Sequence, residues 1–118
     1  MADLYHIVIA QGDTYQLNIT WSDSGGTPVN LTSYTARMDV RTNVESSETL
    51  LTSQGASPTI RLTLGGIAGT ILLVISADNT SALLATSRGV YDLELVSNAN
   101  VVTKILRGNV TVLPEVTR

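Results

Sequence analysis

The chain is dominated by segments in which apolar and polar residues alternate. Residues 14–21 carry a large apolar side chain at every second position, namely at Tyr15, Leu17, Ile19 and Trp21. The same alternation recurs in residues 34–41, 59–64 and 89–96. Successive side chains of a β-strand point to opposite faces of its sheet, so this period of two predicts four half-buried strands.

Other segments are apolar without a polar face. Residues 71–75 and 101–106 are apolar at nearly every position. Such segments are typical of central strands, or of strands that a partner covers. Residues 5–10 and 109–113 are further apolar segments of strand length. The chain is therefore expected to hold about eight short strands.

Turn-forming residues separate these segments. Residues 23–28 read DSGGTP, and Gly65, Gly66 and residues 97–100 predict hairpin turns. Residues 76–85 lose the alternation, and Ser76 or Asp78 can cap a helix there, so we expect one short helix across the end of the sandwich. Residues 42–57 interrupt the strand pattern with polar residues and predict a long loop.

Short strands joined by turns, without long helices, favour an all-β fold. We predict a single Ig-like antiparallel β-sandwich of about eight strands with one short helix, and a β-barrel is the alternative. "Ig-like" describes the architecture only, because the chain has no cysteine for the disulfide that marks antibody domains. A length of 118 residues predicts that residues 1–118 form one domain.

Charged residues are scarce. They make up 14% of the chain, compared with about 25% in an average soluble domain. The net charge is −3 without a cluster of Lys or Arg, so we expect no nucleic-acid partner. The longest apolar run is far shorter than the roughly 20 residues of a spanning helix, so we expect no membrane partner either. A surface of neutral polar residues suits a protein packed in an assembly, and it equally suits a soluble Thr-rich domain.

Few residues offer catalytic or ligand-binding chemistry. His6 is the only histidine, and we interpret it as an exposed side chain of the first strand, since no nucleophile motif accompanies it. Asp92 and Glu94 share a strand face and could present two carboxylates to a sugar or a metal. The simpler interpretation is that they pair with Lys104 or Arg107 across a hairpin. We predict no enzyme activity, no cofactor, no metal and no small-molecule substrate.

A second group of charges lies on residues 34–41. Arg37, Asp39 and Arg41 alternate in sign along one predicted strand face. Such a face is typical of a solvated surface with cross-strand ion pairs. An interface with a partner subunit is the alternative, because charges are scarce elsewhere in the chain.

Two segments resemble a known family. They are QGDTYQLNITWSDSGGTPVNLTSYTARMDVR, residues 11–41, and GVYDLELVSNANVVTKILRGNVTVLPEVTR, residues 89–118. Both resemble a widespread group of small virion proteins from tailed bacteriophages and prophages. The first also looks like the N-terminal domain of phage baseplate upper proteins, with its QG turn, its Trp-containing strand and its NLT-Y step. This sequence is expected to depart from those baseplate proteins by having no receptor-binding module after its last strand.

The resemblance implies a non-enzymatic structural protein of the bacteriophage virion, assembled in the host cytoplasm. It would be an assembly or adaptor component of the tail, neck or baseplate region, where it could dock tail fibres. A capsid decoration protein is the alternative. A carbohydrate-binding or hydrolytic domain that uses Trp21, the tyrosines, Asp92 and Glu94 is a remote one. The expected partners are other virion proteins of the tail, neck, baseplate, fibre or capsid, with the protein present in multiple copies.

We expect the contact surfaces at residues 1–10, 42–57 and 114–118 and on the sheet face that carries the alternating charges. The candidate interface residues are Tyr5, Ile7, Ile9, Arg37, Asp39, Arg41, Glu115 and Arg118. Sheet edges are further candidates, because a neighbouring chain can add a strand to them.

Overall fold

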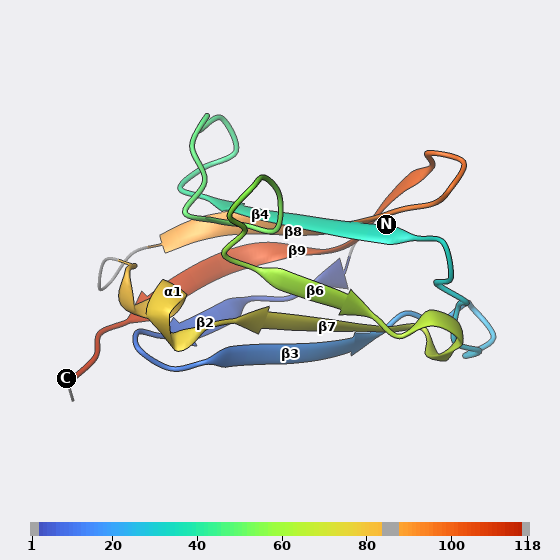
Figure 1. Ribbon diagram of the computed structural model, residues 1–118, viewed down its shortest axis with the longest axis horizontal. Helices are drawn as coiled ribbons and strands as arrows, with labels where there is room; N and C mark the ends of the chain where they lie inside the picture. The colour runs from blue at the N-terminus through green and yellow to red at the C-terminus, as the bar shows by residue number, and fades with distance from the viewer. Residues whose placement is uncertain (1–2, 84–87, 117–118) are drawn as a thin grey trace.

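The computed structural model of the protein describes residues 3–83 and 88–116, and it folds as two β-sheets packed face to face (Figure 1). The elements in chain order are β1 (Asp3–Leu4), β2 (Ile7–Ala10), β3 (Tyr15–Thr20), β4 (Thr35–Arg41), β5 (Leu51–Thr52), β6 (Arg61–Leu64), the 3-10 helix η1 (Gly66–Ala68), β7 (Thr70–Ile75), α1 (Ala77–Ser81), β8 (Arg88–Val96) and β9 (Val102–Leu113). The larger sheet has the order β1-β9-β8-β4-β5, with β2 also paired to β9, and the smaller sheet has the order β3-β7-β6. The predicted all-β sandwich with one short helix is confirmed.

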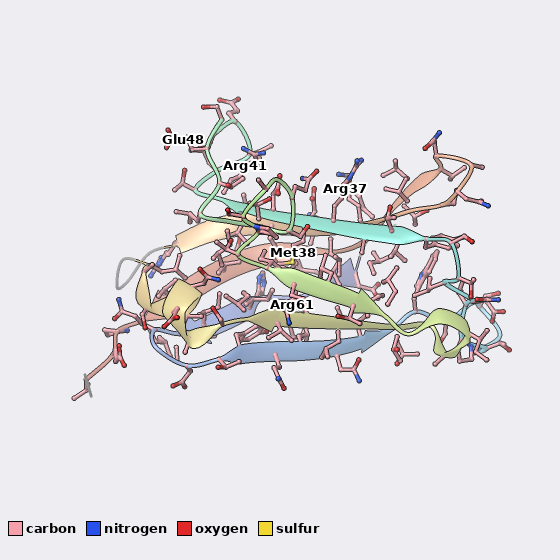
Figure 2. All side chains as sticks on the ribbon, in the orientation of Figure 1. Arg37, Met38, Arg41, Glu48 and Arg61 are labelled. Carbon is pink, nitrogen blue, oxygen red and sulfur yellow. The ribbon has the colours of Figure 1, made fainter. Side chains whose placement is uncertain are left out.

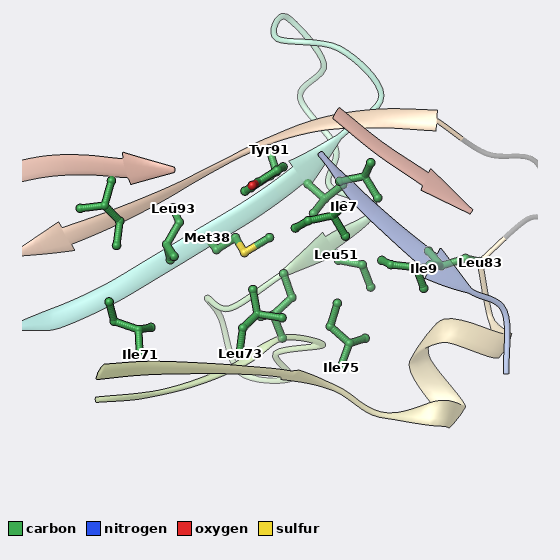
Figure 3. Packing of buried hydrophobic residues seen from close by; sticks show 14 of the residues in the cluster. Ile7, Ile9, Met38, Leu51, Ile71, Leu73, Ile75, Leu83, Tyr91 and Leu93 are labelled. Atoms are coloured by element: carbon green, nitrogen blue, oxygen red, sulfur yellow. The ribbon is translucent and has the colours of Figure 1, made fainter. Parts of the chain in front are cut away.

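One hydrophobic core lies between the two sheets (Figure 3). The alternation of the sequence accounts for it, because every second residue of β4, β7 and β8 points inward. Met38, Leu73 and Leu93 are each at most 1% exposed, and they come from three different strands. Burying such a side chain stabilises the fold by roughly 1.5–3 kcal/mol. The strand faces read from the sequence are therefore the faces that build the core.

The sheets are antiparallel except at one edge, where β1 and β2 run parallel to β9. The predicted strand over residues 5–10 is broken there at Tyr5 and His6. The Tyr91 hydroxyl donates to the Tyr5 carbonyl at 2.6 Å, and the Asn109 N–H donates to His6 Nδ1 at 3.1 Å. The Tyr5 carbonyl also lies so close to Gly108 that a Cβ there would clash with it. The predicted antiparallel sandwich therefore has one parallel edge, formed by β1 and β2 with β9.

The two nearly uncharged segments are both central strands. β7 lies between β3 and β6, and β9 lies between β8 and the β1–β2 edge. The expectation of separate strands at residues 101–106 and 109–113 is wrong, because β9 is one strand of 12 residues. A bulge opposite Leu93 and Glu94 shifts its register and lets it continue.

The helix closes one end of the sandwich. The Asn79 N–H donates to the Ser76 hydroxyl at 3.3 Å, which is the predicted N-cap. Thr80 is buried and its hydroxyl donates to the Asp13 carbonyl at 2.7 Å, which ties α1 to the loop after β2 (Figure 1). The helix ends at Ser81, so it is shorter than predicted, and the last part of the predicted segment lies outside the described residues.

The hairpins β6–β7 and β8–β9 agree with the turn prediction. The predicted loop over residues 42–57 is only partly a loop, because it contains β5, which pairs with β4. A strand of two residues is too short for period two to reveal it.

Candidate interaction surface

The outer face of the larger sheet gathers most of the charges of its strands. Period two places Arg37 and Arg41 on the outer side of β4, while Met38 between them points into the core (Figure 2). The strand register then brings outward residues of β8 and β9 alongside them. We call this set the charged strip, and its members are Arg37, Asp39, Arg41, Asp92, Glu94, Lys104 and Arg107.

Glu94 is the centre of the charged strip. Its carboxylate accepts a hydrogen bond from Arg37 Nε at 2.5 Å and one from Lys104 Nζ at 2.8 Å. Lys104 also reaches Asp92 at 3.0 Å, so the predicted pairing across the β8–β9 hairpin is confirmed. The hydrogen bonds from Lys104 and then Arg37 lower the pKa of Glu94, because they favour its charged form. The same contacts raise the pKa of Lys104, with the hydrogen bond to Glu94 as the largest cause.

Asp39 faces a like charge and is stabilised from its other side. Its register partner on β8 is Asp92, an arrangement that is unfavourable by itself. The Thr52 hydroxyl donates to Asp39 at 2.5 Å, the Gln54 amide at 3.2 Å and Arg41 at 3.1 Å. Burial alone would raise the pKa of Asp39, but these hydrogen bonds and the charge of Arg41 together lower it. These contacts therefore favour the charged form of Asp39 despite the like charge opposite it.

An open groove of about 280 Å³ lies over part of the charged strip. Asp39, Arg41, Asp92, Lys104 and Arg107 line it, together with the apolar Val44 and Val90. Arg107 makes no ion pair with any residue that the structure describes. A groove lined by charges of both signs and by apolar side chains is suited to a polar segment of another protein.

Exposed apolar side chains flank the charged strip along the β1–β2 edge. Leu4 is 62% exposed, Val8 53% and Leu113 47%. Their register partners Arg107, Thr111 and Ala10 place them on the same outer face. We call Leu4, Val8 and Leu113 the apolar edge. Apolar side chains beside a polar surface are typical of protein interfaces.

The predicted interface residues of β2 do not belong to this surface. Ile7 and Ile9 are each 1% exposed and lie in the core, so assigning them to an interface is wrong. Tyr5, at the break between β1 and β2, is 43% exposed. The alternation of residues 5–10 could have revealed Val8, because it has the opposite parity to Ile7 and Ile9. The sequence-based prediction did not include the apolar edge, because it did not separate the inward residues of this segment from the outward ones.

The remaining candidates lie apart from the charged strip. The Glu115 N–H donates to Gln11 Oε1 at 3.0 Å, just beyond the end of β9. The end of β9 at Leu113 is itself about 30 Å along the strand from Lys104, at about 3.3 Å per residue. Glu115 therefore belongs to the end of the sandwich near α1. Arg118 lies outside the described residues.

The residues proposed for carbohydrate binding do not share a cleft. Trp21 packs against the core and stacks edge-on with Tyr34, with ring centroids 6.3 Å apart. Asp92 and Glu94 point outward from the other sheet and are paired with Lys104. Within residues 3–83 and 88–116, no group of three or more His, Cys, Asp or Glu residues could hold a metal ion.

Neither the family models nor the curated proteins contain a significant match to this chain. In the described part of the chain, neither helix has the length and apolar character needed to cross a membrane. The candidate surface is thus defined by its own geometry, which consists of the charged strip, the groove over it and the apolar edge.

Proposed function

We propose that this protein is a non-enzymatic structural component of a tailed-bacteriophage virion, acting as an assembly or adaptor protein in the tail, neck or baseplate region. Its partners would be other virion proteins, which it would meet in the host cytoplasm during assembly. The resemblance of residues 11–41 and 89–118 to small phage virion proteins supports this proposal. The observation that carries it is the apolar edge beside the charged strip.

The chemistry of this surface fits docking better than catalysis. The apolar edge offers area that a partner can desolvate, and the charged strip offers orientation, because complementary charges fix the register of two surfaces. Most charges of the strip are already paired within the sheet, so a partner need not neutralise them. A modest contact of this kind becomes strong when several copies bind a symmetric particle.

The test is the distribution of the protein between purified tails and tail-less heads, measured by quantitative mass spectrometry. We expect it on tails, with a copy number that matches tail symmetry. Hundreds of copies on heads would instead support a capsid decoration protein, and absence from both would overturn a virion role.

Variants connect this test to the surface. Val8→Lys places a charge in the apolar edge, at a side chain that is 53% exposed, so the fold should persist. We expect this variant to be at least about tenfold depleted from particles. The matched control is Ile67→Lys, at a side chain that is 77% exposed. Ile67 lies on η1, which connects β6 and β7 of the smaller sheet, so this change does not touch the apolar edge. Equal depletion of both variants would remove the apolar edge from the proposal.

A further inference from the structure

The strand β3 is an open edge of the smaller sheet. Among the described strands it pairs only with β7, and it lies at the lower border of the molecule in Figure 1. Natural proteins protect such edges with charged side chains, proline, bulges or very short strands. β3 has the sequence YQLNIT, with six residues, no charge, no proline and an unbroken register. The opposite edge, β6, is shorter and begins with Arg61.

The position beside β3 is one that a strand can occupy. In constant-type immunoglobulin sandwiches, one sheet has the order A-B-E-D, in which the first strand pairs with the second. Here the corresponding sheet has only three strands, because β1 and β2 join β9 in the other sheet. The edge of β3 that would otherwise pair with the first strand is therefore left open.

The ladder hydrogen bonds fix which backbone groups face this edge. The Trp21 N–H donates to the Gly69 carbonyl at 2.8 Å, so residues of the same parity in β3 bond to β7. The Gly65 N–H donates to the Thr70 carbonyl, so the even-numbered residues of β7 bond to β6 and its odd-numbered residues bond to β3. Both observations therefore give the same assignment. Gln16, Asn18 and Thr20 consequently direct their N–H and C=O groups outward, and nothing in the described part of the chain bonds to them.

The inner side of β3 is also incompletely covered. Leu17 and Ile19 point toward the core but are only half-buried. Their partners on β7, Leu73 and Ile71, are at most 1% exposed. The difference arises because β7 has a strand on each side and β3 has one. A strand added beside β3 would cover this flank and satisfy the outward backbone groups in one step.

We infer that β3 pairs with β3 of a second copy of this chain, antiparallel across a two-fold axis at Asn18. Residues that lie opposite each other in an antiparallel pair point to the same face of the sheet. An axis between two residues would pair inward residues with outward ones, so the axis must pass between two copies of the same residue. Centring it on Asn18 gives every outward backbone group a partner within the strand. The resulting pairs are Asn18 with Asn18, Gln16 with Thr20, Leu17 with Ile19, and Tyr15 with Trp21.

These pairs make β3 self-complementary. Polar residues meet polar residues on the outer face, and apolar residues meet apolar ones on the inner face. β3 has no charged residue, so pairing two copies brings no like charges together. Edge lysines in other proteins prevent such pairing by charge repulsion. A second copy is thus a better occupant than a charged strand, and the pairing holds wherever the protein acts.

The absence of cysteine makes a direct test simple. Asn18→Cys introduces the only thiol of the chain, at an exposed position. The two copies of residue 18 would form a hydrogen-bonded pair with Cα atoms about 5.5 Å apart, which a disulfide can span. We expect rapid oxidation to a covalent dimer. Thr63→Cys, exposed on β6 of the same sheet, is the matched control and should cross-link far more slowly.

Light scattering during size-exclusion chromatography supplies a second measurement. We expect the unmodified chain to have twice its 12.5 kDa mass at high concentration. Asn18→Lys should raise the dimer Kd about tenfold or more, because two ammonium groups would face each other at the axis, whereas Thr63→Lys should leave it unchanged. A monomeric mass at every concentration, or equal cross-linking at residues 18 and 63, would overturn the pairing.

Discussion

The two sheets of this sandwich treat charge in opposite ways. The strands of the smaller sheet contain one charged residue, Arg61, whereas the outer face of the larger sheet carries the whole charged strip. The low charge content of the chain is therefore unevenly distributed. Charged side chains, which protect edge strands in other proteins, are nearly absent from the smaller sheet. On the larger sheet most of them form ion pairs with one another.

This difference separates two ways of contacting a neighbour. The larger sheet offers side chains, namely the apolar edge and the charged strip. Any attraction between this strip and a charged partner would weaken as the salt concentration rises. The smaller sheet offers backbone groups along β3, whose hydrogen bonds depend little on salt. The same protein could thus hold a copy of itself through one sheet and a different subunit through the other.

The sharpest test of this comparison is whether both sheets depend equally on the core. Leu73 of β7 and Leu93 of β8 are each at most 1% exposed and come from opposite sheets. We expect Leu73→Ala and Leu93→Ala each to lower the free energy of unfolding by about 2–5 kcal/mol, measured by urea denaturation. Ile67→Ala, at an exposed side chain, should change it by less than about 0.5 kcal/mol. A near-neutral Leu73→Ala would mean that the smaller sheet is only loosely packed.

A second test concerns the edge that carries the apolar residues. A Cβ at Gly108 would meet the Tyr5 carbonyl, so Gly108→Ala must push the β1–β2 connection away from β9. We expect a loss of about 1–3 kcal/mol in the free energy of unfolding. Gly25→Ala is the control, because a Cβ there makes only an ordinary contact of 3.4 Å with Asp23. Equal effects would show that β1 and β2 can move freely.

Period two predicted most of this fold because it reports which residues face a core. It placed β3, β4 and β8 correctly and anticipated the ion pairs of Lys104 with Asp92 and Glu94. It could not reveal the parallel edge, because the Tyr5–His6 break depends on Gly108 and Tyr91, which lie about 85 to 105 residues away in sequence. Contacts between such distant segments leave no local pattern.

The candidate surface was predictable only in part. The alternation of Arg37, Asp39 and Arg41 marked one outward strand, but the strip also needs the register with β8 and β9. Ile7 and Ile9 were assigned to an interface because a terminal apolar segment reads alike whether it is buried or exposed. Their burial is decided by the packing of β7 and Leu83 against the same core (Figure 3).

A third prediction isolates one hydrogen bond at the edge. Tyr91→Phe removes the hydroxyl that donates to the Tyr5 carbonyl at 2.6 Å. We expect a loss of about 1 kcal/mol in the free energy of unfolding, with faster amide exchange in β1 and β2. Tyr34→Phe is the control, since the Tyr34 hydroxyl has no hydrogen-bond partner among the described residues, and it should be near neutral. Unchanged exchange in β1 and β2 would contradict the role assigned to Tyr91.

The smallest effect concerns the charged strip itself. Glu94→Gln removes the charge that Lys104 and Arg37 share. We expect a loss of about 0.5–1 kcal/mol in the free energy of unfolding at pH 7, because the side chains of both partners are partly exposed to solvent. The pKa of Glu94 is lowered from its ordinary 4.5 by those partners, so its contribution is present above pH 4.5 and lost as the pH falls through the folded value.

The free-energy gap between the unmodified chain and Glu94→Gln should therefore be full at pH 7 and should close in acid below pH 4.5. High salt should narrow it at pH 7, since screening weakens exposed pairs. Glu48→Gln, on the loop before β5, is the matched control because Glu48 makes no ion pair with the described residues. A free-energy gap that persists unchanged in acid would mean that Glu94 stabilises the fold through packing. The charges of the larger sheet would then add nothing to stability that the smaller sheet lacks.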